Sequence, residues 1–283
     1  MTIQEVIKGT TIDAVSYQPR EEIFAAGAPS DRGTALVLEG SVEAFHNGAD
    51  ELSRPVAIYQ PGNFFGLAAA LSLPRMERAV AGSSGAKVLY LNEAAFLRYV
   101  RENQNFLSKL HTLMLGRLRE LSTAKVEKPS EAIDVDALFG AGSKNRLETI
   151  RHTNLKIPEY LNKMRNRFLS ARQKLFEAED ANDSLVYLII EGEIEQYWSE
   201  AGTESLVVAI GPGSLFGFLR GRVGKGHLLT AKAGAKGAKL IGLDDDILAR
   251  ICHVDGHLAY SVFQNILLTI AVIQQFMMRG SHI

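Results

Sequence analysis

The chain has 283 residues, which is long for one compact domain and sufficient for two, and its 46% hydrophobic content can supply a core to each half. Its 31 lysines and arginines nearly balance 32 aspartates and glutamates, which excludes a global charge that would drive binding to nucleic acid or anionic lipid. The single cysteine, Cys252, excludes an internal disulfide and multi-cysteine metal motifs, and it fits the reducing cytoplasm, where we expect the protein.

An internal repeat organises the chain. Residues 21–45, EEIFAAGAPSDRGTALVLEGSVEAF, recur as QKLFEAEDANDSLVYLIIEGEIEQY at residues 173–197, so that Phe24 matches Phe176. Further along, PGNFFG at residues 61–66 recurs as PGSLFG at residues 212–217. The repeat therefore predicts two copies of one domain.

Strands and helices follow in the same order in each copy. Residues 35–45 and 186–198 are rich in β-branched and aromatic side chains and broken by Glu-Gly, which predicts two strands that meet at a turn, as in a roll or barrel. Residues 106–121 have apolar side chains at three-to-four-residue intervals and predict a closing helix. Residues 258–278 predict a second closing helix that is apolar nearly all round and must be buried on most sides.

The segment between the copies predicts a partly ordered linker. Lys-Pro-Ser at residues 128–130 and Gly-Ala-Gly-Ser at residues 140–143 punctuate it, and residues 146–175 read as helical. We expect a first domain at 1–128, a helical linker at 129–169 and a second domain at 170–283. From Lys144 to Lys174, nine lysines and arginines stand against Glu148 and Glu159, so this stretch is either a solvated connector or a surface for nucleic acid or an acidic protein. It lacks interleaved aromatic residues, and we expect no nucleic acid there.

The repeated motifs resemble the cyclic-nucleotide-binding family, which includes catabolite activator proteins and protein kinase A regulatory subunits. Each copy has the apolar-Phe start, the Leu-Glu-Gly or Ile-Glu-Gly turn and a Pro-Gly-x-x-Phe-Gly motif, over roughly residues 8–125 and 170–280. The resemblance implies an α+β fold of two tandem β-roll (jelly-roll) domains, each flanked by helices. It also implies a phosphate-binding cassette after each Phe-Gly, where a short helix presents backbone N–H groups to an anion.

The first cassette, residues 64–82, keeps only part of the family pattern. Family members that bind cyclic nucleotides place a Glu after the Phe-Gly for the ribose hydroxyl, and Leu67 stands there in this chain. Pro74-Arg75 matches the family's Pro-Arg, so Arg75 is either an anion ligand or a partner of Glu77 or another carboxylate. The candidate ligand-binding residues are Phe65, Gly66, Leu67, Ala68, Arg75 and Arg78.

The second cassette, residues 215–234, departs further from the pattern. Phe218 replaces the Glu and no Pro-Arg follows, so we expect Phe218 and Leu219 to fill the ribose volume. The glycine-rich stretch also carries a cluster of basic side chains, which either face an anion or belong to a solvated loop: Arg220, Arg222, Lys225 and His227. The candidate ligand-binding residues are Phe216, Gly217, Phe218, Leu219, Arg220 and Arg222.

The sequence predicts no catalytic residues, cofactor or metal. His253 and His257 are four apart, which would place them on one helix face, but no zinc-protease pattern accompanies them. Residues 258–278 have the length of a membrane span, yet six polar side chains are distributed through them, so a span is not expected.

These features predict a non-enzymatic regulatory or adaptor protein of signal transduction that does not bind cAMP or cGMP in the usual way and acts through a protein partner. One alternative is a sensor of another anionic small molecule through Arg75, and a second is a membrane- or complex-associated subunit anchored by the last helix. We also expect a homodimer, because a helix that is apolar all round leaves an apolar face beyond its own roll. Its predicted interface consists of Val262, Ile266, Thr269, Ile273 and Phe276.

Overall fold

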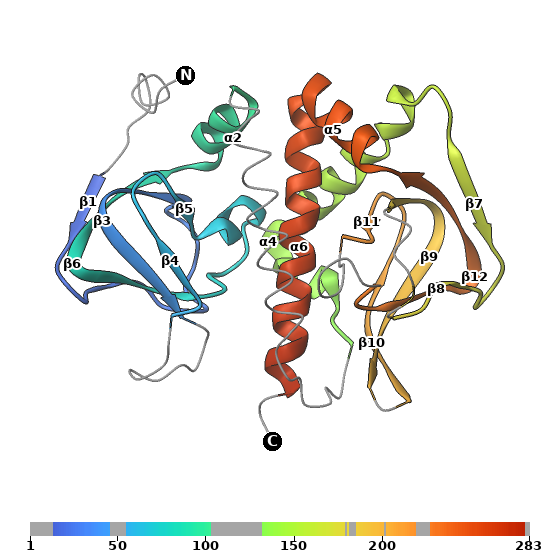
Figure 1. Ribbon diagram of the computed structural model, residues 1–283, viewed down its shortest axis with the longest axis horizontal. Coiled ribbons are helices and arrows are strands. Elements are labelled where there is room, and N and C mark those ends of the chain that lie inside the picture. Colours follow the sequence, from blue (N-terminus) through green and yellow to red (C-terminus); the bar gives the residue numbers. More distant parts are fainter. Residues whose placement is uncertain are drawn as a thin grey trace. The chain divides into compact units, whose positions relative to one another are not determined.

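The computed structural model describes residues 14–45, 55–102, 132–178, 180, 185–200, 202–218 and 227–280 (Figure 1). The chain divides into two compact units, Met1–Asn103 and Gln104–Ile283. Each unit holds one six-stranded antiparallel sheet. The prediction of an α+β fold with two tandem β-rolls is confirmed, while the exact domain boundaries at 128 and 169 stay predictions.

The first unit is a roll with one helix after it. Its sheet order is β1-β6-β3-β4, with β2 paired to β6 and β5 paired to β3. Its core combines small side chains of β3 and β6, several of them alanine, with the aromatic side chains of Tyr17, Tyr59, Phe65 and Tyr90. The elements are β1 (Ala14–Tyr17), β2 (Glu22–Phe24), β3 (Thr34–Phe45), β4 (Ala57–Tyr59), β5 (Phe64–Phe65), the 3-10 helix η1 (Leu67–Leu71), β6 (Arg78–Leu91) and α2 (Glu93–Glu102).

The second unit repeats this order between helices. Its sheet order is β10-β9-β12-β7, with β11 paired to β9 and β8 paired to β12. The elements are α4 (Val135–Asn154), η2 (Ile157–Tyr160), β7 (Arg165–Leu169), β8 (Lys174–Phe176), β9 (Val186–Glu200), β10 (Thr203–Ile210), β11 (Leu215–Phe216), β12 (Thr230–Leu243), α5 (Asp245–Val254) and α6 (Gly256–Gly280).

The two sheets share their register as well as their order. In the first, Ala35 pairs with Tyr90 and Val42 with Ala81. In the second, Tyr187 pairs with Gly242 and Ile194 with Ala233. Each of the four residues of the second sheet lies 152 positions after its counterpart in the first sheet. Residues 21–45 and 173–197 of the sequence repeat are separated by the same step. Residues of the two rolls can therefore be compared one to one along the central strands.

The predicted turn at Glu-Gly is wrong, because β3 and β9 run through it as single long strands. Gly40 and Gly192 have φ angles of 73° and 81°, and the strand pairing shifts around both. A Cβ atom on Gly40 would lie 2.1 Å from the carbonyl oxygen of Gly85, and one on Gly192 would lie 2.1 Å from that of Gly237. The glycines therefore bend the strands as bulges, where the backbone of the neighbouring strand leaves no room for a side chain.

The helical reading of the linker is correct only in part. Asp134 caps α4 by accepting hydrogen bonds from the N–H groups of Asp136 and Ala137, and the helix continues through the glycines at residues 140–143 that were expected to interrupt it. Residues 165–169, expected to be helical, form β7, and β8 begins inside the expected helix at Lys174. β7 is an edge strand with exposed charged side chains, which hides the apolar alternation that marks a strand.

The last helix, α6, is confirmed. Ser261 Oγ donates hydrogen bonds to the carbonyl oxygen of Ile150 and to Asn154 Oδ1 on α4, at 3.2 and 2.7 Å. The stretch Gly256–Phe276 is long and apolar enough to cross a membrane, but 78% of its most apolar window is buried inside the structure, as in the core helix of a folded domain. Length and composition alone are weak support for a membrane span.

Candidate functional site

The first cassette begins at an aromatic cluster. Phe65 at the end of β5 is fully buried, and its ring lies 5.7 Å from the ring of Phe24 on β2 and 5.6 Å from that of Tyr59 on β4. Gly66 follows with a φ angle of 63°, and η1 begins at the next residue. The short helix that the resemblance implied after the Phe-Gly is therefore present in this roll, with Leu67 partly buried and Ala68 buried.

Arg75 fastens this cassette to the rest of the roll. It is 3% exposed, and its Nη1 donates to the carbonyl oxygen of Gly66 at 2.9 Å while its Nη2 donates to that of Gly33 at 2.8 Å. The guanidinium carbon lies 4.5 Å from the centre of the Phe24 ring. One side chain thus joins the cassette, the turn before β3 and strand β2.

The guanidinium of Arg75 is only partly satisfied. Burial lowers the pKa of Arg75 from its usual value, which means that its charge is held in a site with little water. Its Nε is buried and has no hydrogen-bond partner, and no carboxylate in the described part of the chain forms an ion pair with it. The expected partner Glu77 is also buried, where it accepts a hydrogen bond from the Tyr59 hydroxyl at 3.2 Å.

The two candidate arginines of the first cassette, Arg75 and Arg78, pack on different aromatic rings. Arg78, at the start of β6, lies over the ring of Phe45 at 5.0 Å, whereas Arg75 lies over Phe24. Each arginine therefore packs on an aromatic ring of a different strand, and a bidentate clamp formed by both is not seen.

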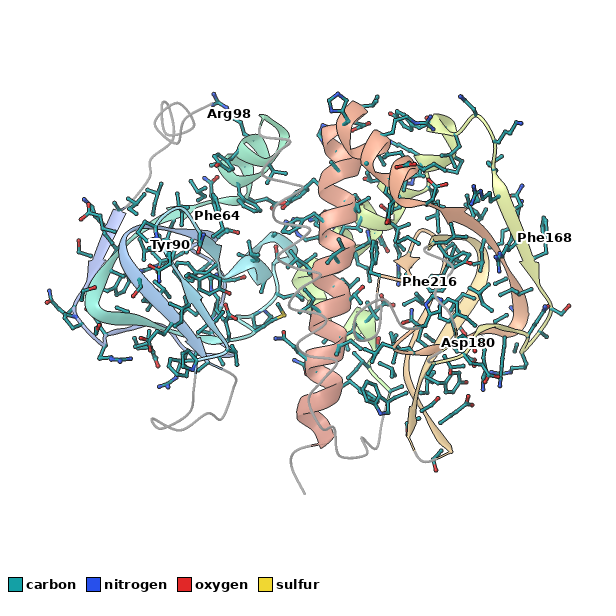
Figure 2. All side chains as sticks on the ribbon, viewed as in Figure 1. Phe64, Tyr90, Arg98, Phe168, Asp180 and Phe216 are labelled. Carbon is teal, nitrogen blue, oxygen red and sulfur yellow. The ribbon has the colours of Figure 1, made fainter. Side chains whose placement is uncertain are left out.

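A tyrosine pair inside the first roll was missed by the sequence analysis. The hydroxyls of Tyr17 and Tyr90 are 2.7 Å apart, and the guanidinium of Arg32 lies 5.6 Å from the centre of the Tyr90 ring (Tyr90 is labelled in Figure 2). Burial, with the hydrogen bond to Tyr17, raises the pKa of Tyr90, so this phenol stays neutral. No local motif marks the pair, because 73 residues separate its members.

The second cassette is built on an aromatic core. Phe216 on β11 lies 5.5 Å from the ring of Tyr187 and 6.3 Å from that of Phe176, measured between ring centres (Figure 2). Gly217 has a φ angle of 95°, and Phe218 is 6% exposed. Leu219, Arg220 and Arg222, the remaining candidates, lie outside the described residues.

His227 is the first residue of the second cassette that the structure describes after residue 218. It is 3% exposed, and its imidazole stacks on the ring of Phe176 with centres 3.5 Å apart and planes 8° apart. Its position in the sequence suggested a member of the cation cluster on the glycine-rich stretch. Instead, it is a buried side chain packed on β8.

Several of the five residues of the predicted dimer interface contact the interior of the second unit. Thr269 and Ile273 line a small cavity together with residues of β10 and β11, and the Phe276 ring lies 6.4 Å from that of Trp198 on β9. Val262 and Ile266 are 1% and 2% exposed. Self-association stays a prediction, and these contacts show that the chosen residues also serve the packing of their own unit.

The predicted helical pair of His253 and His257 is wrong. α5 ends at Val254, and Asp255 has extended backbone angles, so the two histidines lie on different helices. The Asp255 carboxylate accepts hydrogen bonds from the backbone N–H groups of His257 and Leu258 and thereby caps α6. Among the described residues, no group of three or more His, Cys, Asp and Glu side chains could hold a metal ion.

Comparisons with known proteins find one family model and several similar solved structures. Residues 14–103 match the family model of the cyclic nucleotide-binding domain, and no curated protein sequence matches the chain. The regulatory domain of Toxoplasma gondii PKA, solved with cAMP, is similar at 14% identity over 92% of this chain and 85% of that one, with a TM-score of 0.30. A cAMP-independent protein kinase A regulatory subunit from Trypanosoma cruzi, bound to guanosine, has 14% identity over 92% and 83%, with a TM-score of 0.29. Oxidized CprK with o-chlorophenolacetic acid has 20% identity over 43% and 50%, with a TM-score of 0.36.

The fold and the family match define a class of regulatory β-roll domains, which are not catalytic. Residues 14–103 match that family, and the strands β7 to β12 repeat the topology of the first roll in the second unit.

Proposed function

We propose that the protein is a non-enzymatic regulatory or adaptor protein of signal transduction whose two rolls do not bind cAMP or cGMP and which acts through a protein partner. The observation that carries this proposal is the state of Arg75. The guanidinium in the cassette donates to two backbone carbonyl oxygens of its own roll, at 2.9 and 2.8 Å, and so serves as a cross-link. These two bonds and the packing on Phe24 fix the guanidinium against its own roll, so a cyclic phosphate would have to compete with them for its orientation.

The ribose side of each cassette supports the same conclusion. Leu67 and Phe218 stand where family members that bind cyclic nucleotides have an acidic acceptor, and Phe218 is buried. A ribose hydroxyl placed against either side chain would lose its hydrogen bonds to water without replacement, which costs about 1–3 kcal/mol. The buried carboxylate of Glu77 lies two residues after Arg75 and disfavours a further anion in the first roll.

Calorimetric titration of the full chain with cAMP and with cGMP tests the proposal. We expect no measurable heat of binding at micromolar nucleotide, and an Arg75→Gln variant should behave like the parent chain. Micromolar or tighter binding by the parent chain that Arg75→Gln abolishes would overturn the proposal and assign the first roll a nucleotide.

The second candidate function is a sensor of a different small anion in the first roll. The observation that favours it is the buried Nε of Arg75, a charged donor without a hydrogen-bond partner. Thermal denaturation in inorganic phosphate, compared with chloride at equal ionic strength, tests this candidate. Stabilisation of the first unit that disappears in Arg75→Gln would support the anion sensor, and equal behaviour of the two chains would exclude phosphate as its ligand.

A further inference from the structure

The strands β1 and β7 occupy the same place in the two rolls. Ser16 on β1 pairs with Lys87 of β6, and Phe168 on β7 pairs with Lys239 of β12. Phe168 and Lys239 each lie 152 positions after their counterparts in the first roll. In the described part of the chain, β1 and β7 are each the last strand at one end of their sheet. The two edges can therefore be compared residue by residue.

The same row of side chains starts at each edge and continues across the sheet. Lys87 is ion-paired with Glu39 on β3 at 3.3 Å, and Lys239 is ion-paired with Glu191 on β9 at 3.4 Å. The row of the first roll ends at a serine, whereas that of the second ends at Phe168, which is labelled in Figure 2 and is 70% exposed. The second roll thus adds an exposed aromatic ring to an otherwise equivalent row.

A second apolar side chain lies at the same edge. Met164, directly before β7, is 51% exposed, and it lies four residues before Phe168. Single exposed apolar residues are common on protein surfaces, but two at one sheet edge form a contact surface for a partner. Lys239 Nζ lies 5.9 Å from the centre of the Phe168 ring, so a cation borders this surface.

The charge of the two edges differs as well. Val15 on β1 corresponds to Arg167 on β7, and the stretch of residues 160–176 has five lysines and arginines but no acidic residue. Arg165 begins β7 and is ion-paired with Asp244 at 3.5 Å, yet 63% of its side chain stays exposed. Lys163, two residues earlier, is also exposed. The edge of the second roll is therefore cationic where that of the first is neutral.

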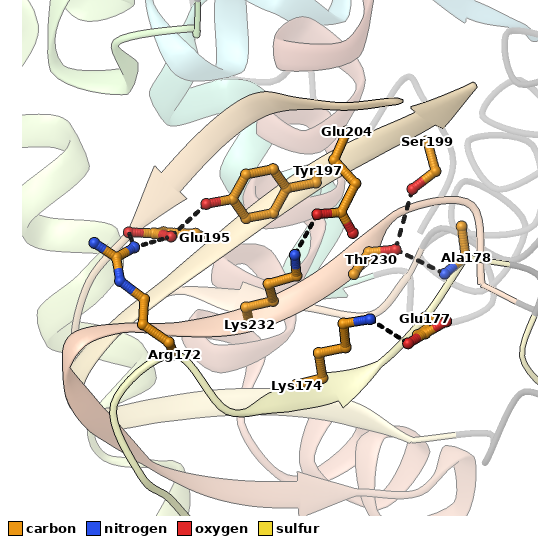
Figure 3. A network of polar contacts seen from close by, with 10 residues as sticks. All are labelled: Arg172, Lys174, Glu177, Ala178, Glu195, Tyr197, Ser199, Glu204, Thr230 and Lys232. Atoms are coloured by element: carbon orange, nitrogen blue, oxygen red, sulfur yellow. Dashed lines mark hydrogen bonds and ion pairs between the residues drawn. The ribbon is translucent and has the colours of Figure 1, made fainter. Parts of the chain in front are cut away.

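The basic residues that follow β7 contribute to the roll itself (Figure 3). Arg172 is ion-paired with Glu195 of β9 at 2.6 Å, and Lys174 is ion-paired with Glu177. These cations already have carboxylate partners inside their own sheet. The charge that can attract a partner is thus concentrated on β7 and on the residues just before it.

We propose that β7 is a docking edge for an acidic, extended segment of a protein partner, which adds a strand to the second sheet. This inference rests on the proposed role of the chain as an adaptor and names the surface that it uses. The backbone of the edge strand supplies hydrogen bonds, Met164 and Phe168 supply apolar contact, and Lys163 and Arg165 select carboxylates.

The charge of β7 also decides against a second copy of the chain at this edge. Two β7 strands paired with each other would bring arginines of one copy close to arginines of the other, and like charges across a strand pair are destabilising. An acidic strand instead places opposite charges side by side. The neutral β1 edge of the first roll has neither the cations nor the aromatic ring that such a strand requires.

Hydrogen exchange of the full chain with a synthetic peptide tests the proposal. The probe is a peptide of about eight residues in which glutamate and valine alternate, added at about 1 mM. We expect it to slow exchange in residues 165–169 and to leave residues 14–17 of the same sample unchanged. The same peptide with proline in place of valine keeps the charge but lacks half of the backbone N–H donors, and it should not slow exchange.

Fluorescence anisotropy of the labelled peptide measures the side chains. Phe168→Ser installs the residue that the first roll has at this position and should weaken binding by at least about tenfold. Arg165→Glu reverses a charge and should weaken it by a similar factor. Ile58→Ser removes an exposed apolar side chain from β4 of the first roll and should leave binding unchanged, as the matched control.

Unchanged exchange in residues 165–169, or equal affinity of the parent chain and Phe168→Ser, would overturn the docking edge. Equal protection by the proline peptide would also overturn it, because charge alone would then explain binding. Protection by an oligothymidylate in place of the peptide would overturn it and assign the edge to nucleic acid. Addition of cAMP to the same sample tests the proposed function separately, since slower exchange in residues 64–82 would overturn that function whatever happens at β7.

Discussion

The two rolls have the same strand order and register but fasten their cassettes differently. In the first, the Arg75 guanidinium reaches two carbonyl oxygens and an aromatic ring. In the second, the His227 ring stacks on Phe176. The comparison teaches that the roll depends on its apolar interior and on its backbone contacts, while the polar group at the cassette can change without a change of topology.

The largest effect should come from α6. Ile266 is 2% exposed, and a carboxylate there is buried without a partner, so Ile266→Asp should lower the free energy of unfolding of the second unit by about 4 kcal/mol. Denaturation monitored by hydrogen exchange in each unit measures the loss.

Light scattering on the same variant sharpens this result. The predicted dimer would give twice 31.0 kDa for the parent chain. If Ile266→Asp restores 31.0 kDa while both units keep their stability, Ile266 belongs to a subunit interface. If the second unit is destabilised at unchanged mass, it belongs to the core.

Smaller losses of unfolding free energy should follow from removal of the cassette side chains Arg75 and His227. Arg75→Ala removes two charge-assisted hydrogen bonds and should cost the first unit about 3 kcal/mol. His227→Ala removes a buried ring and should cost the second unit about 2 kcal/mol. Arg75→Lys should not recover the loss, because one ammonium cannot reach both carbonyl oxygens. Recovery by lysine in urea denaturation would show that charge alone matters at this position.

The bulge glycines should behave alike in the two rolls. Gly40→Ala and Gly192→Ala each bring a methyl group against a carbonyl oxygen at a positive φ angle, and each should cost about 2 kcal/mol. Gly27→Ala is the control, since its φ angle is 79° but a Cβ atom meets nothing within 4 Å, and it should cost about 1 kcal/mol. Unequal losses at Gly40 and Gly192, measured by urea denaturation, would break the equivalence of the two strands.

The smallest effect concerns the cap of α6. Burial of Asp255 alone would raise its pKa, but hydrogen bonds from Tyr160, Leu258 and His257 outweigh it and lower the pKa. The folded state thus favours the ionised carboxylate. This carboxylate stabilises the second unit fully at a pH above the usual pKa of aspartate, and the stabilisation is lost as the pH falls through the lowered pKa of Asp255. Asp255→Ala should cost about 1 kcal/mol at neutral pH. Its loss should shrink as the pH falls through the lowered pKa of Asp255, and an undiminished loss in acid would contradict this role.

The repeat made most of the fold predictable from the sequence. The Phe24 and Phe176 match, the Pro-Gly-x-x-Phe-Gly motifs and the apolar last helix all predicted features that the structure contains. The bulges at Gly40 and Gly192 could not be distinguished from turns, because both need a glycine at a positive φ angle. β7 escaped prediction because its exposed charged residues resemble a helical connector.

The candidate sites were less predictable, because they depend on contacts that are distant in sequence. Arg75 was found from Pro74-Arg75, but its bond to Gly33 spans 42 residues and has no local signal. His227 lies 152 residues after Arg75, but the change from arginine to histidine leaves no residue-type signal for this correspondence. Alignment by the 152-residue step of the paired strands would have found it.

Hydrogen exchange of the unmodified chain, with and without saturating cAMP, tests the central claim most directly, because it resolves both cassettes in one sample. We predict unchanged exchange in residues 64–82 and in residues 215–234, since Arg75 is engaged by its own backbone and Phe218 is buried at the ribose position. Protection by cAMP of either segment would contradict the account and show that the roll concerned still binds a cyclic nucleotide.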